Sequence, residues 1–287
     1  MRCPGKHSSG PLSFAALAAP AALLAAVACA PSAGAGDFNL ITAKGGASLG
    51  TFFNSNDLKI RVDGETDNLG TKIDWSNTFG AGEKNRFRLD GVWRFTPKHH
   101  MRVMVTDYST SQTETLERDV EWGDDLIRAG STVTGKVGFS IAEVAYEYAL
   151  KHKENMELAL TAGIHYTTFE AKLTADLDTS GGDLQGQLGG KASVDAPLPV
   201  FGARGMWRLG GDFYLDAMFQ WFALSIDQYS GGLLNYRGAA IWQPKQWVGI
   251  GVGYDYFNVD VDVKKRNFKG TMDWTYKGPQ IFFNVGF

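Results

Sequence analysis

The chain has 287 residues and a formal net charge of −3, with 35 glycines and an aromatic content of 13%. The near-neutral charge argues against nucleic-acid binding, and the glycine and aromatic content favours β structure. Beyond residue 35, no segment approaches the roughly 18 to 20 consecutive apolar residues that a membrane-spanning helix requires. Spanning by helices is therefore excluded.

Residues 1–35 have the features of a cleavable signal peptide. They combine a basic start at Arg2 and Lys6, an alanine-rich apolar run over 14–30 and a final Ala-Gly-Ala cleavage site. The alternative is lipoprotein processing at Cys29, although the preceding residues lack the usual leucine. Under either interpretation the chain is exported from the cytoplasm. Both cysteines lie in this segment, so the mature chain has no thiol, which suits an oxidising periplasm.

Apolar and polar side chains alternate with a period of two over most of the remaining sequence, which is typical of strands. The clearest case runs from Arg86 to Phe95, where Phe87 and Leu89 share one face and Arg88 and Asp90 share the other. The pattern predicts an all-β fold, a closed antiparallel transmembrane β-barrel of ten strands, with eight or twelve as alternatives. Closure is required in lipid because an open edge would leave backbone groups without partners.

The predicted barrel spans residues 57–287 and follows an N-terminal segment at 36–56. Its first strand is interrupted. The predicted strands are 57–78, 85–96, 99–120, 131–151, 156–178, 193–208, 211–227, 232–243, 247–264 and 268–287.

The predicted connections alternate between short turns and longer polar links. Short turns belong on the periplasmic side of such a barrel, and longer loops belong outside. The short stretches are 96–99, 151–155, 209–211 and 243–246, and the links lie around 80–84, 122–130, 179–191, 227–231 and 264–267.

In two predicted strands the apolar residues change face midway. The change falls between Tyr166 and Phe169 in one strand, and between Tyr256 and Val259 in another. One extra residue reverses the facing of everything after it, so a β-bulge is predicted at each change.

The position of aromatic residues distinguishes a membrane barrel from a soluble β-sandwich, whose strands also alternate between apolar and polar side chains. Amphipathic rings favour the depth of lipid headgroups, and here aromatics gather beside the predicted periplasmic turns, with two tryptophans at the opposite rim. The first group is Trp93, Phe95, Tyr146, Tyr148, Trp207, Trp242 and Trp247, and the second is Trp75 and Trp274.

The chain ends on a strand in which Ile281, Phe283, Val285 and Phe287 share one face. This ending resembles the terminal signature of outer-membrane β-barrel proteins, and the whole mature chain is similar to the small OmpA-like and OmpW-like class. The resemblance implies location in a Gram-negative outer membrane, recognition by the barrel-assembly machinery, and contact with periplasmic chaperones and outer-membrane lipids.

Charged residues on the polar faces are predicted to line the lumen, with both signs in similar number. Such side chains would pair across a barrel only modestly wider than one of eight strands. The expected role is either a structural plug or a narrow pore for a small solute or ion. The predicted lining charges are Arg86, Arg88, Asp90, Arg94, Glu143, Glu147, Glu157, His165, Arg204, Arg208, Asp216, Arg237 and Asp255.

An outer-membrane enzyme acting on lipid or peptide substrates is the alternative function. Hydroxyl catalysis needs a histidine to take the proton, and only His165 lies mid-strand, two residues before Thr167. This spacing is weak evidence, so no catalytic residue is assigned. Acidic stretches at 121–125 and 255–262 lack an ordered ligand spacing, so no metal or cofactor is expected.

Overall fold

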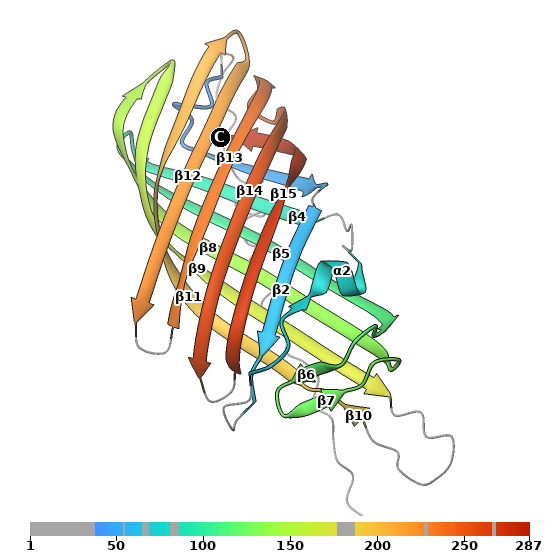
Figure 1. Ribbon diagram of the computed structural model, residues 1–287. Coiled ribbons are helices and arrows are strands. Elements are labelled where there is room, and N and C mark those ends of the chain that lie inside the picture. The colour runs from blue at the N-terminus through green and yellow to red at the C-terminus, as the bar shows by residue number, and fades with distance from the viewer. Residues whose placement is uncertain are drawn as a thin grey trace, which may run out of the picture.

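The computed structural model describes residues 38–53, 55–64, 69–80, 86–176, 187–226, 229–265 and 268–287. Ten strands of this described chain form an antiparallel sheet that closes, because the last strand also pairs with the first (Figure 1). The predicted fold class and strand number are therefore confirmed. Around the barrel the strands are β1 (Gly45–Phe52), β4 (Arg86–Thr96), β5 (His99–Thr115), β8 (Thr132–Lys153), β9 (Met156–Asp176), β11 (Lys191–Gly210), β12 (Phe213–Ile226), β13 (Tyr229–Lys245), β14 (Val248–Lys265) and β15 (Phe268–Gly286).

Among the described residues, no helix is both long enough and apolar enough to cross a bilayer. The predicted signal peptide at 1–35 lies outside the described residues.

The wall begins earlier than residue 57. β1 pairs with β4 and with the end of β15, whereas β2 (Ser55–Val62) pairs with β15 farther from the C-terminus. The two form one interrupted strand along β15. The glycine-rich sequence of β1 carries little hydrophobic alternation, which is why periodicity placed the boundary too late. The predicted first strand does not run on to residue 78: β3 (Ile73–Asp74) pairs back onto β2, and the short helix α2 (Trp75–Phe79) follows it.

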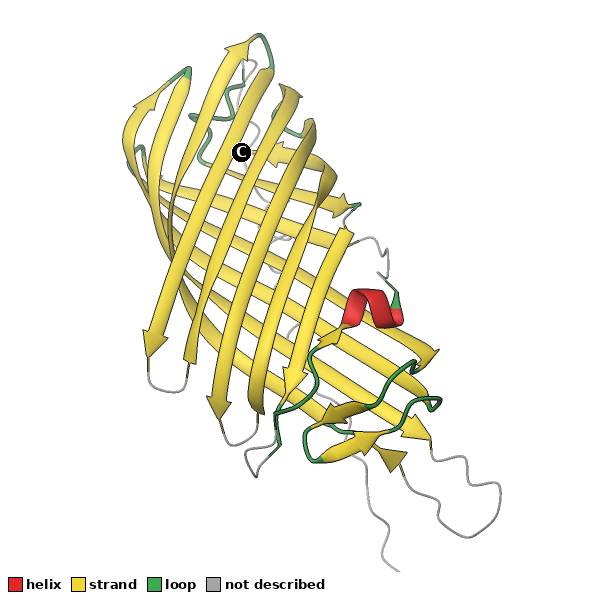
Figure 2. Ribbon diagram, viewed as in Figure 1, coloured by secondary structure: helices red, strands yellow, loops and turns green. Residues whose placement is uncertain are grey.

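The two ends of the barrel differ in their connections. Two-residue turns at 97–98, 154–155, 211–212 and 246–247 fall within or beside the predicted short stretches, and they lie at the end that holds the C-terminus. We call this end the turn end. The opposite, loop end carries α2 and the hairpin of β6 (Val120–Trp122) and β7 (Asp125–Ile127), as Figure 2 shows, with β10 (Gln187–Leu188) beside β9.

The outer surface changes character partway along the strands. On β9 the outward residues are apolar from Leu158 to Tyr166, and Glu170 and Lys172 follow them toward the loop end. On β14 the apolar run ends at Tyr256 and is followed by outward polar residues. A run of about 9 to 11 residues from the turn end is the length that a tilted strand needs to cross the hydrocarbon. The strands therefore continue beyond the bilayer.

The inner surface changes in the opposite sense. Its side chains are charged in the turn half, whereas in the loop half they form a buried apolar core that includes Phe139, Phe169, Phe257 and Val259. The loop half is thus a barrel of the water-soluble kind, with a polar outside and an apolar inside.

The predicted β-bulges are wrong. β9 pairs with β8 and with β11 in unbroken register through Tyr166 and Phe169, and β14 pairs with both neighbours without a shift from Tyr256 to Val259. The apolar residues change face because the solvent outside the wall changes from lipid to water. Extra residues are not needed to explain the pattern.

Trp75 and Trp274 were predicted to face the membrane at the far rim, but both are buried inside the loop half. Trp274 packs against Phe139, with ring centroids 3.9 Å apart, and Trp75 packs against Phe79 of α2. A Cβ on Gly135 would lie only 2.7 Å from the Trp75 ring, so this glycine makes room for α2 against the inner wall. The aromatics at the turn end are exposed or half-buried on the outer surface.

The β6–β7 hairpin packs over the loop end of the core. The Trp122 ring lies 6.2 Å from that of Trp75, and its indole nitrogen donates to the carbonyl of Gly190. Asp119 accepts a bond from the backbone N–H of Ala129, and this bond holds the pKa of the exposed carboxyl below its ordinary value.

We expect the position of the lipid boundary to be measurable with two substitutions on β9. Leu160→Arg places a cation in the apolar belt and should lower the free energy of unfolding by about 2–4 kcal/mol, whereas Thr168→Arg should change it little. Urea titrations of both variants in lipid vesicles test this. Equal losses of unfolding free energy in the two variants would show that the lipid boundary does not lie between Leu160 and Thr168.

Candidate functional site

All but one of the charged residues predicted to line the lumen are buried inside the barrel; the exception, Arg208, is half-buried at the turn end and binds the carbonyl of Gly211. Each buried one has at most 7% of the residue's surface exposed. Arg86 packs over the Trp274 ring of the apolar core, and the others lie in the turn half. The buried residues come from alternate positions of β4, β8, β9, β11, β12, β13 and β14, because alternate side chains of a barrel strand point inward. They are Arg86, Arg88, Asp90, Arg94, Glu143, Glu147, Glu157, His165, Arg204, Asp216, Arg237 and Asp255.

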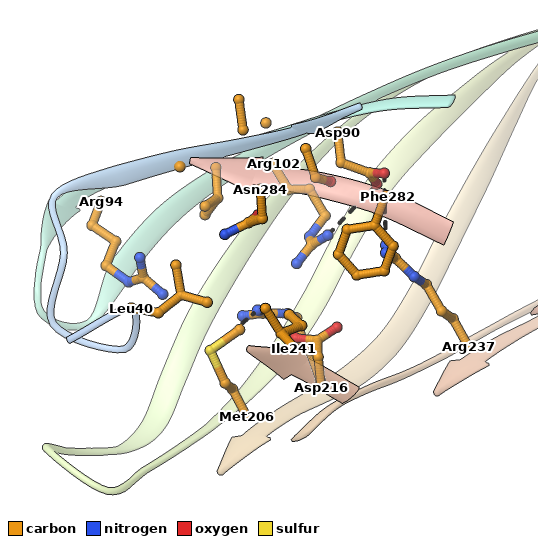
Figure 3. A pocket seen from close by; sticks show the side chains of 16 residues that line it. Leu40, Asp90, Arg94, Arg102, Met206, Asp216, Arg237, Ile241, Phe282 and Asn284 are labelled. Atoms are coloured by element: carbon orange, nitrogen blue, oxygen red, sulfur yellow. Dashed lines mark hydrogen bonds and ion pairs between the residues drawn. The ribbon is translucent and has the colours of Figure 1, made fainter. Parts of the chain in front are cut away.

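One group of ions is centred on Asp90. Its carboxylate lies 2.8 Å from the guanidinium of Arg88, 3.6 Å from that of Arg237 and 3.8 Å from that of Arg102. Asp255 meets the other side of Arg88 at 3.5 Å. Figure 3 shows Asp90 between Arg102 and Arg237, which approach it from different strands. Each buried charge of this group therefore has a partner of opposite sign.

A second group is centred on Arg204. This guanidinium lies 2.6 Å from Asp216, 3.2 Å from Glu157 and 3.9 Å from Glu147. Arg102 donates to Glu147 at 3.0 Å and so joins this group to the first one. The result is a continuous ionic network across the lumen.

His165 belongs to a smaller polar chain. Its Nε2 lies 3.0 Å from a carboxylate oxygen of Glu143, and Gln220 donates to the other oxygen at 2.6 Å. Asn235 in turn donates to Gln220 at 2.9 Å. His165 and Thr167 are both buried in the interior.

Sequence reasoning missed several members of this network. Arg102 and His100 lie on the inward face of β5, where the alternation that identified the other strands could have found them. Gln220 and Asn235 carry no charge, and only their isolation among apolar residues marks them. Partners such as Gln220 and Glu143, 77 residues apart, are brought together by barrel closure.

A small cavity remains between the two ionic groups. Its volume is about 50 Å³, and its polar lining consists mainly of arginine and aspartate side chains (Figure 3). A space of this size holds only about one or two water molecules. The charged residues that line it are Asp90, Arg94, Arg102, Arg204, Asp216 and Arg237.

The N-terminal residues close the turn end. Leu40 and Ile41 are buried against Tyr214 and Phe282, and the backbone N–H of Leu40 donates to the Tyr214 hydroxyl at 3.3 Å. Asn39 donates to the carbonyl of Glu154 in a turn on the rim. Residues 38–41 thus cover the opening of the barrel at the turn end, next to the ionic network, and we call this segment the stopper.

Three potential metal ligands lie near this end. One ligand atom from each of His100, His152 and Glu157 falls within 4.8 Å of the others. Arg94 and Arg204 both bind the second carboxylate oxygen of Glu157. These two guanidinium groups, 3.3 and 3.2 Å from Glu157, would repel a metal cation bound beside them. We therefore assign the trio to the ionic network.

Comparison with known proteins identifies a shared fold. No family model and no curated protein matches the sequence. The structure is similar to the outer-membrane protease OmpT of Escherichia coli, with a TM-score of 0.56, 12% identity, and coverage of 85% of this chain and 96% of that one. The chain has the fold of an outer-membrane β-barrel protein. Because one barrel fold carries many activities, this likeness extends to the fold alone.

Two further similar structures are more distant. Ail of Yersinia pestis gives a TM-score of 0.32 at 11% identity, covering 84% of this chain and 99% of that one. The Pseudomonas putida toluene transporter TodX gives 0.35 at 8% identity, covering 87% and 92%. These scores are too low to support a functional argument.

We expect Arg204→Ala to lower the free energy of unfolding by about 3–5 kcal/mol, because it leaves buried carboxylates without their cation. Arg208→Ala is the matched control: this half-buried arginine on the same strand binds a turn carbonyl, and its loss should cost less than about 1 kcal/mol. Urea titration in vesicles compares the two. Similar losses would show that Arg204 is not a centre of the network.

Proposed function

We infer that the protein is an integral barrel of a Gram-negative outer membrane whose axis is closed to ions. One observation carries this proposal: the ionic network spans the lumen at the level of the apolar belt, and the cavity between its two groups has a volume of only about 50 Å³. The stopper at the turn end and the apolar core at the loop end add a barrier on each side. The function supported best is structural: the turn half anchors the barrel in the membrane and holds the folded loop half above it.

The ionic network also bears on the narrow-pore alternative. Ion passage would require the Arg204 and Asp90 groups to separate, and each separation would leave buried charges without partners. The enzyme alternative receives no support from His165, because this side chain is fully buried in the interior and offers no surface to a substrate.

The refolded protein is expected to produce no steady conductance steps in a planar bilayer. The double variant Arg102→Ala with Glu147→Ala removes one opposed pair, keeps the net charge and enlarges the lumen. This variant should produce small discrete steps. Regular steps from the unchanged protein would support the narrow pore and overturn the closed-axis proposal.

The C-terminal signature supports insertion by the barrel-assembly machinery. Ile281 and Phe283 are exposed on the outer wall, while Val285 and Phe287 are half-buried on the same face at the turn end. A partner in the periplasm could therefore reach this face before the strand meets lipid. Periplasmic chaperones and outer-membrane lipids are the other partners that we propose.

Phe287→Ala should reduce the amount of heat-modifiable, folded protein in the outer-membrane fraction of cells, because it shortens the terminal apolar face. Phe213→Ala removes an exposed phenylalanine near the turn end of β12 and serves as the control. Equal recovery of the two variants would argue against a signalling role for the last residue.

A further inference from the structure

The wall has a seam between β11 and β12. Pairing of these strands begins at Phe201 with Trp221 and continues from there to the turn end. On the loop side of this pair, β11 remains bonded to β9 and β12 remains bonded to β13. Residues 195–200 and 222–226 therefore form no ladder with each other within the described sheet.

Two prolines account for the seam. Toward either end of β11, Gly190 and Arg208 direct their backbone groups to the β9 side, and the β9 register is unbroken between them. Even-numbered residues thus face β9, and odd-numbered residues face β12. Pro197 and Pro199 are odd, so both positions that lack an N–H lie on the edge toward β12.

A cavity opens behind this seam. Its volume is about 350 Å³, more than twice the roughly 150 Å³ of an apolar cavity known to hold benzene. Ala196, Leu198, Phe222, Val259 and Val261 line it, and these are apolar side chains from three strands.

Two neighbouring features keep this space open and extend it. Gly231 and Gly232 contribute no side chains to the wall of the cavity. A small adjoining space reaches Phe169 and Met272 in the core of the loop half.

The seam lies at the edge of the apolar belt. Phe201 and Trp221, the pair at its foot, are 56% and 55% exposed on the outer surface. Asp195 and Asp260, on the loop side, are exposed carboxylates. A molecule entering here would come from the lipid interface, and the acidic rim disfavours an anionic one.

We propose that the cavity is a lateral binding site for an uncharged hydrocarbon group, which enters through the seam from the outer leaflet. The group is either a free hydrocarbon or the acyl chain of an uncharged lipid, and the cavity chemistry is the same for both. The site rests on the proposed outer-membrane location but is independent of closure along the axis.

The absence of cysteine after residue 35 allows a direct test with the folded protein. Ala196→Cys places one thiol in the cavity, and its reaction with N-(1-pyrenyl)maleimide, which is uncharged, is compared with that of a charged sulfonated maleimide. Ser140→Cys, on the exposed face of β8, is the control for access from water, and Ala145→Cys is the control for a buried position away from the cavity. We expect the cavity thiol to react with the uncharged reagent alone, the exposed control thiol with both reagents and the buried control thiol with neither.

Sealing the wall is the second arm. Pro197→Thr with Pro199→Thr restores the two missing donors and should slow labelling of the cavity thiol roughly tenfold, because each backbone bond favours the closed wall. Pro279→Thr, in β15, is the proline control and should leave the rate unchanged. If the sealed variant does not fold, Leu198→Trp fills the cavity instead and should have the same effect.

Lipid and free hydrocarbon are distinguished by the medium. If an acyl chain occupies the site, labelling is slower in vesicles than in lipid-free detergent; if a free hydrocarbon is bound, only added decane or toluene slows it. Labelling of the cavity thiol by both reagents or by neither, or an unchanged rate after sealing and filling, overturns the proposal. Heat-modifiable migration is recorded for each variant, so failure to insert in the membrane, which concerns the proposed function, is seen separately.

Discussion

Each long strand of this barrel must satisfy two different solvents in succession on its outer face. For about 9 to 11 residues the outside is hydrocarbon, where an unpaired backbone group is costly and a charged side chain is excluded. Beyond that point the outside is water. β9 meets both demands without a break in register, by exchanging which face carries its apolar side chains between Tyr166 and Phe169. The charged lumen, the apolar core of the loop half and the polar outer surface above the belt all follow from this exchange.

Much of this fold could be predicted from sequence because both halves of a strand obey a period of two. The bounds of β8, β9, β14 and β15 and the positions of the short turns depend on alternation and turn residues, which are local. β1 was missed because glycine has no side chain to alternate. The face changes were misassigned because a bulge and a change of solvent produce the same pattern in one strand. The recurrence of the change at a similar distance from the turn end is the signal that separates them.

The polar site was predictable only in part, for a related reason. Alternation indicates which residues face inward, and it therefore identified Arg88, Glu147 and Arg204. It says nothing about which of them meet, because partners come from strands that are far apart in sequence, as with Arg94 and Glu157, 63 residues apart. Uncharged members such as Asn235 can be recognised only once their neighbours are known.

A polar interior at the level of the membrane has a physical cost, since buried ion pairs add little net stability. An apolar interior there would make both faces of each crossing strand hydrophobic, and such segments aggregate when they are exposed before insertion. Alternation with charge keeps the unfolded chain soluble, and pairing among the charges then closes the lumen. The same constraint limits where the wall can open. The carbonyls of β12 that face Pro197 and Pro199 lack donors from β11, so they require water or the lipid interface, and this is where the seam lies, just beyond Phe201 and Trp221.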